Sequence, residues 1–162
     1  MRLLKLGIVS CGFLGCSPVA PGTVGTLGGV LIAWSLRGAA PYLLWVAIAV
    51  LAVYLVGRAL GGWAEEYAGK DPGIFVLDEV AGYLVTIAWI APPSYLTLAV
   101  GFFVFRFFDI VKPAGIRRLE KIPGADGILL DDVLAGLYGL IVMAAVRLLS
   151  GDSSMWQWGV NG

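Results

Sequence analysis

The sequence predicts an all-α protein, a polytopic membrane helical bundle of about five hydrophobic helices with polar motifs gathered on one face. Three observations support this fold class. Only 14% of the 162 residues are charged, against roughly 25% in an average soluble domain. The mean hydropathy is +0.89. Long stretches contain no charged residue, and these cover 6–36, 38–57, 80–105 and 133–146. The length suits one domain over residues 1–162.

Prolines and glycines divide these stretches into helices. In the stretch 6–36, the Gly/Pro-rich loop at 15–26 leaves only the later part of the stretch to form the first helix. In the stretch 80–105, Pro92-Pro93 ends one helix before another begins at Ser94. A span needs about 20 residues for about 30 Å of hydrocarbon, so the shorter helices must extend into charged flanks. We expect helices at 24–36, 42–66, 76–91, 94–112 and 128–149. A soluble oligomer that buries these helices is the alternative.

Counting the crossings places all polar motifs on one side of the membrane. If the loop at 15–26 lies on that side, the chain returns to it at 58–77 and again at 106–127. The last segment is the most basic of the chain, with Arg106, Lys112, Arg117, Arg118 and Lys121. The positive-inside rule makes this side cytoplasmic. Trp156 and Trp158 are then expected at the opposite interface.

Two acidic pairs interrupt apolar sequence, Asp78-Glu79 in VLDEVAGYLV and Asp131-Asp132 in LLDDVLAGLYG. Both lie near expected helix starts, where the helix dipole favours negative charge. The dipole does not explain two adjacent acids at each place, because like charges in a core or near lipid are costly. A divalent cation offsets their repulsion, and Mg²⁺ prefers carboxylates, water and substrate phosphate. All four acids are therefore predicted Mg²⁺ ligands.

Two further motifs are candidates for phosphate binding. In FRFFDIVKP, neighbours among Arg106, Asp109 and Lys112 can pair along a helix. They form either a salt-bridge ladder or a functional set, in which Asp109 joins the metal carboxylates and the two cations bind phosphate. In GCSPVAPGTVGTLGG, Thr23 or Thr26 can cap the next helix, whose free N–H groups offer an anion site. Capping with close glycine packing is the alternative for this loop.

Missing residue types narrow the chemistry. The chain has no histidine, which excludes histidine phosphatases, Ser-His-Asp hydrolases and zinc hydrolases. Neither cysteine begins a C-x5-R motif, and no Walker A lysine is present. The zero formal net charge argues against a nucleic-acid partner. What remains is carboxylate-bound Mg²⁺ acting on a phosphate that arginine and lysine hold.

Four motifs together resemble the phosphatidylglycerophosphatase A family: SPVAPGTVGTLGG, LDEVAGY, FRFFDIVKP with GIRRLE behind it, and GILLDDVLAG. The resemblance covers roughly residues 12–149. It implies a Mg²⁺-dependent phosphatase of the bacterial inner membrane that converts phosphatidylglycerophosphate to phosphatidylglycerol and inorganic phosphate. Its implied functional positions are Thr23, Asp78, Glu79, Arg106, Asp109, Lys112, Asp131 and Asp132. Asp126 departs from the family pattern and is a second-tier candidate.

The expected partners are the phospholipid substrate and the membrane, with the active site facing the cytoplasm, and a homo-oligomer is compatible with the pattern. The nucleophile could be a water activated by the metal or one of the aspartates. Two other functions are alternatives. A Mg²⁺-dependent lipid phosphotransferase is disfavoured because the DGxxAR pattern of CDP-alcohol transferases is missing. A divalent-metal channel or transporter is disfavoured because no charge occupies the middle of an apolar run.

Overall fold

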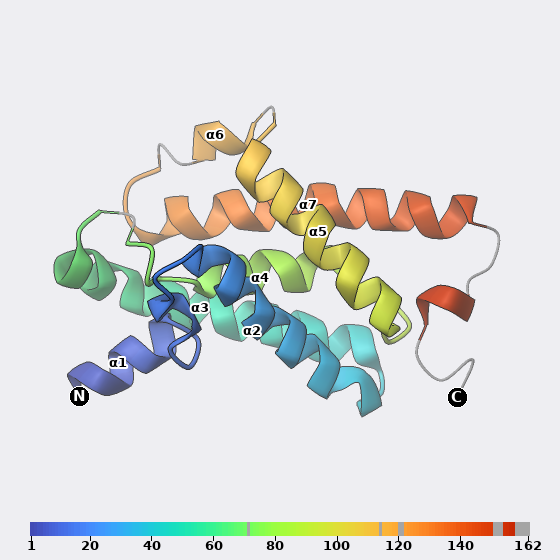
Figure 1. Ribbon diagram of the computed structural model, residues 1–162, viewed down its shortest axis with the longest axis horizontal. Helices are drawn as coiled ribbons and strands as arrows, with labels where there is room; N and C mark the ends of the chain where they lie inside the picture. The colour runs from blue at the N-terminus through green and yellow to red at the C-terminus, as the bar shows by residue number, and fades with distance from the viewer. Residues whose placement is uncertain (71, 114, 120–121, 151–153, 158–162) are drawn as a thin grey trace.

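The computed structural model describes residues 1–70, 72–113, 115–119, 122–150 and 154–157. It is built from helices, as Figure 1 shows. In chain order these are α1 (Arg2–Val9), α2 (Pro21–Ser35), α3 (Tyr42–Ala68), α4 (Leu77–Thr86), α5 (Tyr95–Val111), α6 (Ile116–Leu119) and α7 (Ala125–Leu149). Short 3-10 turns occupy Leu14–Cys16, Leu36–Gly38 and Ser154–Trp156. The described ranges contain no strand, so the predicted all-α class is confirmed.

All five expected helices are present, as α2, α3, α4, α5 and α7, but the sequence predicts neither α1 nor α6. Contacts with another helix hold α1 in place. The guanidinium of Arg2 lies 4.7 Å from the ring centre of Tyr67, and the Lys5 ammonium lies 5.6 Å from that of Trp63. Such cation–π contacts join residues far apart in the chain. A local sequence pattern therefore does not reveal them.

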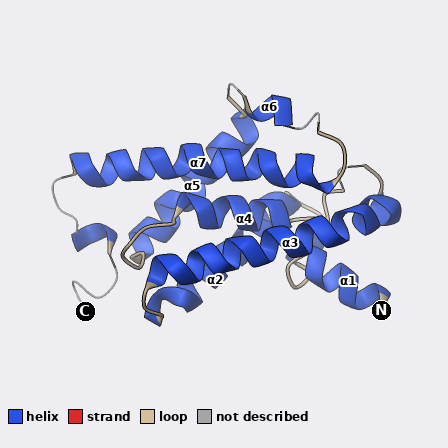
Figure 2. Cartoon of the chain, turned by 180° about the vertical axis from the view of Figure 1, so that it is seen from behind, coloured by secondary structure: helices blue, strands red, loops and turns tan. Residues whose placement is uncertain are grey.

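Helix α4 lies at the centre of the molecule, among α2, α3, α5 and α7 (Figure 1, and from behind in Figure 2). Eight of its ten residues are buried. The helix ends at Thr86, whereas the sequence predicts 76–91, and residues 87–91 lead irregularly into Pro92-Pro93. Ten residues rise about 15 Å, half the thickness of the hydrocarbon core. The third expected helix, at 76–91, is therefore an interior helix that is too short by itself to span the hydrocarbon core.

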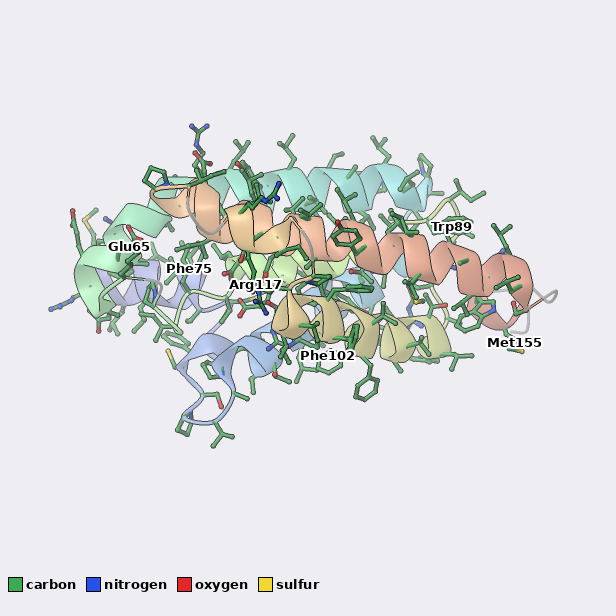
Figure 3. The ribbon with its side chains drawn as sticks, turned by 90° about the horizontal axis from the view of Figure 1, so that it is seen from above. Glu65, Phe75, Trp89, Phe102, Arg117 and Met155 are labelled. Atoms are coloured by element: carbon green, nitrogen blue, oxygen red, sulfur yellow. The ribbon has the colours of Figure 1, made fainter. Side chains whose placement is uncertain are left out.

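Among the described residues, two helices are long and apolar enough to cross a membrane, α3 with 27 residues and α7 with 25. They run antiparallel, since Gly57 packs against Leu129 and Gly61 against Ala125. Only 11% of the most apolar window of α3 is buried. The long axis of the molecule separates Glu65 at one end from Trp89 toward the other (Figure 3). Composition and length thus give two candidate membrane spans in the part of the chain that the structure describes.

The polypeptide tail docks on the start of α5. Trp156 is buried, its Nε1 donates to Ser150 Oγ at 2.9 Å, and its carbonyl accepts from Thr97 Oγ1 at 2.7 Å. Trp158 and Lys121, which the sequence analysis assigned to opposite sides, lie outside the described residues. The interfacial position expected for Trp156 stays a prediction.

Helices α4 and α7 cross at backbone contact because glycines meet at the crossing. A Cβ added at Gly136 would collide with the carbonyl oxygen of Gly82, and one at Gly82 would lie 2.5 Å from the carbonyl oxygen of Asp132. Small residues permit this kind of close helix approach. The crossing positions the first turn of α4 beside the acidic pair Asp131-Asp132 on α7.

Replacing Gly136 with alanine should therefore destabilise the protein. We expect Gly136→Ala to lower the unfolding free energy by about 1–3 kcal/mol, because the new methyl group overpacks the crossing. Gly62→Ala is the matched control: this helical glycine has nothing within 4 Å of an added Cβ, so alanine should be neutral or stabilise by up to about 1 kcal/mol. Thermal unfolding in detergent measures both. Equal midpoints for the two variants would contradict the role given to the crossing.

Candidate active site

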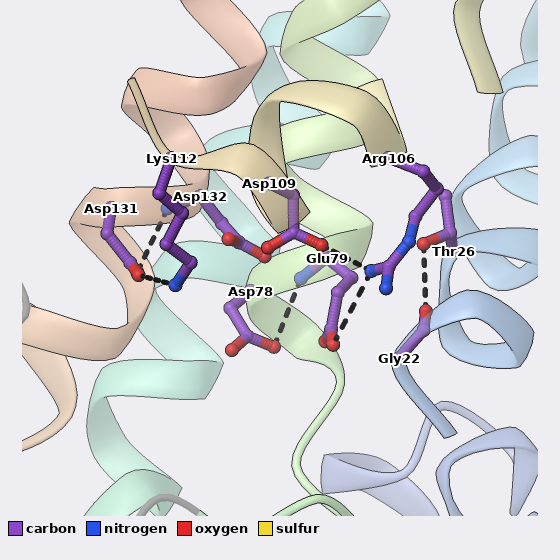
Figure 4. A network of polar contacts seen from close by, with 9 residues as sticks. All are labelled: Gly22, Thr26, Asp78, Glu79, Arg106, Asp109, Lys112, Asp131 and Asp132. Atoms are coloured by element: carbon purple, nitrogen blue, oxygen red, sulfur yellow. Dashed lines mark hydrogen bonds and ion pairs between the residues drawn. The ribbon is translucent and has the colours of Figure 1, made fainter. Parts of the chain in front are cut away.

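One cavity of about 550 Å³ collects most of the predicted site residues. It opens where α4 and α7 begin and where α3 and α5 end. The predicted residues that line it are Asp78, Glu79, Asp109, Lys112, Asp131 and Asp132. Figure 4 shows these side chains converging from α4, α5 and α7. Residues that lie up to 54 positions apart in the sequence, from Asp78 to Asp132, thus share one solvent-accessible space.

The two acidic pairs have the same local geometry. Asp78 Oδ1 accepts from the backbone N–H of Glu79 at 3.0 Å, and Asp131 Oδ1 accepts from that of Asp132 at 3.0 Å. Their helical settings differ, however. Asp78 and Glu79 stand in the first turn of α4, as predicted, but α7 begins at Ala125, so Asp131 and Asp132 stand in its second turn. The helix dipole acts mainly within the first turn, so it does not explain the second pair.

Three of the four predicted metal ligands lie together. One carboxylate oxygen each from Asp78, Glu79 and Asp132 falls within 4.8 Å of the others. Within the described part of the chain, Glu79 Oε2 is buried and has no hydrogen-bond partner. A buried, unbonded carboxylate oxygen among other carboxylates is costly unless a cation compensates it. Three converging oxygen ligands suit a hard cation such as Mg²⁺.

The fourth predicted ligand, Asp131, contacts a lysine instead. Its Oδ2 accepts from Lys112 Nζ at 2.5 Å, and only 5% of the Asp131 side chain is exposed. Lys112 follows the last residue of α5 and has a left-handed backbone, with φ at 47°. Its side chain therefore leaves the surface of α5 and reaches α7. Of the salt-bridge ladder considered for 106–112, the pair of Arg106 and Asp109 forms, and Lys112 reaches Asp131 on α7.

Arg106 lies at the edge of the cavity between two acids. Its Nη1 contacts Asp109 Oδ2 and lies 4.0 Å from Glu79 Oε1. The side chain is 15% exposed, and its Nε is buried without a hydrogen-bond partner among the described residues. The start of α2 lies against it, since a Cβ added at Gly22 would be 3.2 Å from Arg106 Nη1. Free backbone N–H groups at the start of α2 thus lie beside an arginine with a donor to spare.

The predicted cap of α2 is wrong in detail. Ala20 precedes the helix and makes no side-chain cap hydrogen bond. Thr26 is buried, and its Oγ1 donates back to the carbonyl of Gly22 at 2.8 Å. Pro21 at the first helical position supplies the start signal in place of a threonine. Thr23 is half-buried in the first turn and is not among the residues that line the cavity. Its predicted role in phosphate binding stays a prediction.

Sequence reasoning missed two charged residues of the cavity, and it placed Asp126 below the other candidate residues. Glu65 near the end of α3 and the exposed Lys70 line the cavity. In the sequence, the one indication of their role is that these charged residues follow an apolar helix on the membrane side predicted for the other polar motifs. Asp126 lies elsewhere, at 3.2 Å from Arg58 Nε, and accepts from Tyr54 Oη at 2.8 Å. This satisfied pair between α3 and α7 is structural.

Crowding changes the acidity of the first pair. Burial raises the pKa of the Asp78 carboxyl well above its ordinary value, and the neighbouring charge of Glu79 raises it further. Burial also raises the pKa of Glu79. Protons and a metal ion therefore compete for the same oxygens.

Comparison with known proteins gives a consistent result. Residues 7–147 match the family model of phosphatidylglycerophosphatase A. The chain is 38% identical over 155 residues to a Bacteroides thetaiotaomicron protein provisionally named phosphatidylinositol-3-phosphatase, covering 89% of the chain and 94% of that relative. It is 37% identical to the phosphatidylglycerophosphatase A of Haemophilus influenzae, over 91% of the chain and 88% of the relative. The Escherichia coli phosphatidylglycerophosphatase A is 31% identical, over 84% and 77%. No solved structure matches the chain.

Divalent cations should stabilise the folded protein through the carboxylate cluster. With Mg²⁺ at about 100 times its dissociation constant we expect about 2.7 kcal/mol of stabilisation, seen as a raised midpoint of thermal unfolding. Asp132→Asn should remove most of this shift. Asp126→Asn, on the same helix but paired outside the cavity, should retain it. A full shift in Asp132→Asn would contradict the predicted cation site.

The increase that Mg²⁺ causes in the midpoint of thermal unfolding should grow with pH, for example from about pH 6 to about pH 8. At low pH the raised pKa of Asp78 leaves more protons for the metal to displace. The metal-free protein should behave in the opposite way. A carboxyl with a raised pKa holds its proton more tightly when folded, so stability declines as the pH rises from about 4 toward that pKa. Thermal unfolding curves with and without Mg²⁺, recorded from about pH 4 to about pH 8, measure how the stability of each form depends on pH.

Proposed function

Because the chain belongs to the phosphatidylglycerophosphatase A family, we propose how its residues carry out the reaction that this membership supports: hydrolysis of phosphatidylglycerophosphate to phosphatidylglycerol and inorganic phosphate. One observation above all connects the fold to this chemistry. Six carboxylates and two lysines, Lys70 and Lys112, line a single open cavity, with Arg106 at its edge. A phosphate monoester needs a site of this kind, where cations hold its oxygens and a metal compensates the acids.

In this proposal Mg²⁺ is the cofactor, and Asp78, Glu79 and Asp132 hold it. When bound, the ion would supply charge compensation for a phosphate oxygen and activation of water. The unbonded, buried Oε2 of Glu79 supports this assignment, as does the mutual distance of the three carboxylates. Asp131 serves mainly to orient Lys112, because their contact already occupies one of its oxygens.

Arg106 and Lys112 would bind the oxygens of the terminal phosphate from the α5 side. Asp109 fixes the Arg106 guanidinium by its contact with Nη1, which leaves the buried Nε available as a donor. The free N–H groups of Gly22 and Thr23, in the first turn of α2, would add uncharged donors on the opposite side. Donors fixed before the substrate arrives stabilise developing charge without reorganisation. The chain thus offers a preorganised anion pocket next to the carboxylate cluster.

Helices α3 and α7 cross the bacterial inner membrane in this proposal, and the cavity faces the cytoplasm. Both helices place polar residues at the cavity, Glu65 near the end of α3 and the pair Asp131-Asp132 near the start of α7. Arg117 and Arg118 are exposed on α6, which packs against α7. Exposed basic residues near a helix end favour the cytoplasmic side. A cavity at that depth suits a terminal phosphate at the lipid–water interface.

A second lipid substrate is suggested by the Bacteroides relative, whose name refers to phosphatidylinositol 3-phosphate. Both lipids carry a phosphate monoester on a polar headgroup, so the same cations and carboxylates could bind either one. Parallel assays with both lipids separate the two. A kcat/KM at least about tenfold higher for phosphatidylglycerophosphate is the expected result.

Phosphate release from phosphatidylglycerophosphate in detergent micelles tests the function itself. We expect release that requires Mg²⁺ and stops on addition of EDTA. Asp78→Asn and Asp132→Asn should each lower kcat/KM by about 100-fold or more, since each removes a proposed ligand. Asp126→Asn should keep nearly full activity. Wild-type protein that binds Mg²⁺ but releases phosphate from no lipid would refute the enzyme assignment.

Replacing Arg106 with lysine tests the anion pocket. Lysine keeps the charge but loses the planar fork that can contact Asp109 and phosphate together. We expect Arg106→Lys to lower kcat by about 10²–10³-fold with the Mg²⁺-dependent thermal shift retained. Arg58→Lys is the matched control, because Arg58 pairs with Asp126 outside the cavity. A loss confined to the Mg²⁺ shift would instead assign Arg106 a role in shaping the metal site.

A further inference from the structure

An apolar groove of about 390 Å³ runs between α2 and α5 on the outside of the molecule. Its size lies in the range typical of ligand sites. The groove has a firm floor and open walls. Leu98 in the floor is 5% exposed, whereas Leu31 and Phe103 in the walls are 57% and 71% exposed. Tyr83 beneath it donates from Oη to the carbonyl of Leu98 at 3.0 Å, which fixes this part of α5. The groove is therefore a fixed channel whose sides are available to an apolar ligand.

One end of this groove leads to the proposed phosphate site. On α5, Arg106 follows Phe102 and Phe103 by one helical turn, and it therefore lies on the same side of the helix. On α2, Thr23 precedes Leu27 by one turn. The two helices come together there, at the contact between Gly22 and the Arg106 guanidinium. A molecule lying in the groove thus has its polar end at Arg106.

The distance from the proposed phosphate site to the far end of the groove matches one leaflet of a bilayer. The part of α2 from Thr23 to Trp34 rises about 17 Å, and half of a typical hydrocarbon core is about 15 Å. Trp34 and Tyr95 line the far end of the groove. An acyl chain that begins at the level of Arg106 would therefore extend along the groove through most of its own leaflet.

We propose that this groove binds one acyl chain of the phospholipid substrate and thereby positions its phosphate headgroup at Arg106. The inference rests on the proposed lipid phosphatase function and adds the site that holds the lipid part. Binding of a part of the substrate that does not react contributes to catalysis when it orients the reacting part. The groove supplies this orientation, because the chain and the headgroup must follow the axis of α5 together.

A second apolar groove provides an internal comparison. It has about 340 Å³ and lies along α3, α4 and α7, with Ala47 and Leu51 in its lining. Tyr54 belongs to this groove, but its hydroxyl donates to Asp126, which Arg58 already neutralises. Neither residue of that ion pair lines the carboxylate cavity. The second groove is therefore expected to contact bulk lipid without contributing to substrate position.

Two matched alanine-to-tryptophan variants test the proposal. Ala99 lines the α2–α5 groove and Ala47 lines the comparison groove, and both are exposed. The measurement is kcat/KM for dioleoyl and for dihexanoyl phosphatidylglycerophosphate, which share a headgroup. We expect Ala99→Trp to lower the ratio of long-chain to short-chain kcat/KM by at least about tenfold, since a misplacement of about 1 Å at a reacting centre can cost about a hundredfold. Ala47→Trp should leave the ratio unchanged.

An unchanged ratio in Ala99→Trp, or the same decrease in both variants, would overturn the groove assignment while phosphate release continues to support the phosphatase. Absence of release from both lipids by the wild type would overturn the function and the groove together. Photocrosslinking of the wild type with a diazirine-labelled acyl chain requires no substitution and covers the case of a misfolded variant. Labelled peptides from α2 and α5 are expected, and labelling confined to α3 and α7 would refute the proposal.

Discussion

The mutual repulsion of six carboxylates in one cavity is the constraint on which the rest of the structure depends. Two cations at the end of α5 each take one acid, Arg106 with Asp109 and Lys112 with Asp131. Three further acids, Asp78, Glu79 and Asp132, have oxygens that converge within 4.8 Å, and among the described residues they share a single nearby arginine, Arg106, at 4.0 Å from Glu79 Oε1. The protein's own charges therefore stop short of neutrality at one definite place. In the proposed function a divalent cation would complete the balance there, and the phosphate of a substrate would bind next to it.

The two acidic pairs show how similar sequences acquire different roles from their helical positions. Both begin with an aspartate that accepts from the next backbone N–H. In the first turn of α4, both side chains turn toward the shared cluster. In the second turn of α7, Asp132 joins that cluster while Asp131 contacts the lysine that leaves α5. The glycine crossing of α4 and α7 determines this arrangement, because it brings the backbone of Asp132 against Gly82.

The sequence was informative wherever a local rule applied. Pro92-Pro93 separated α4 from α5, and charge-free runs located the five main helices. Paired acids and the FRFFDIVKP motif identified six of the residues that line the cavity. Features that depend on distant contacts could not be predicted in this way. They include the cation–π contacts of α1, the early end of α4, and the separation of Asp131 from the other three predicted ligands. Glu65 and Lys70 belong to no motif, so only the fold reveals them.

Helix α5 relates the apolar and polar parts of the molecule more directly than any other element. Read from its start, it presents Tyr95 and Phe102 along the groove, then Arg106, then Asp109, with Lys112 just beyond its last turn. A phospholipid with a terminal phosphate has the same order of apolar chain and anionic headgroup. Aligning the two in parallel puts the phosphate between Arg106 and the carboxylate cluster without any movement of the helix. The direction of a single helix thus sets both the depth of the lipid and the position of the reacting group.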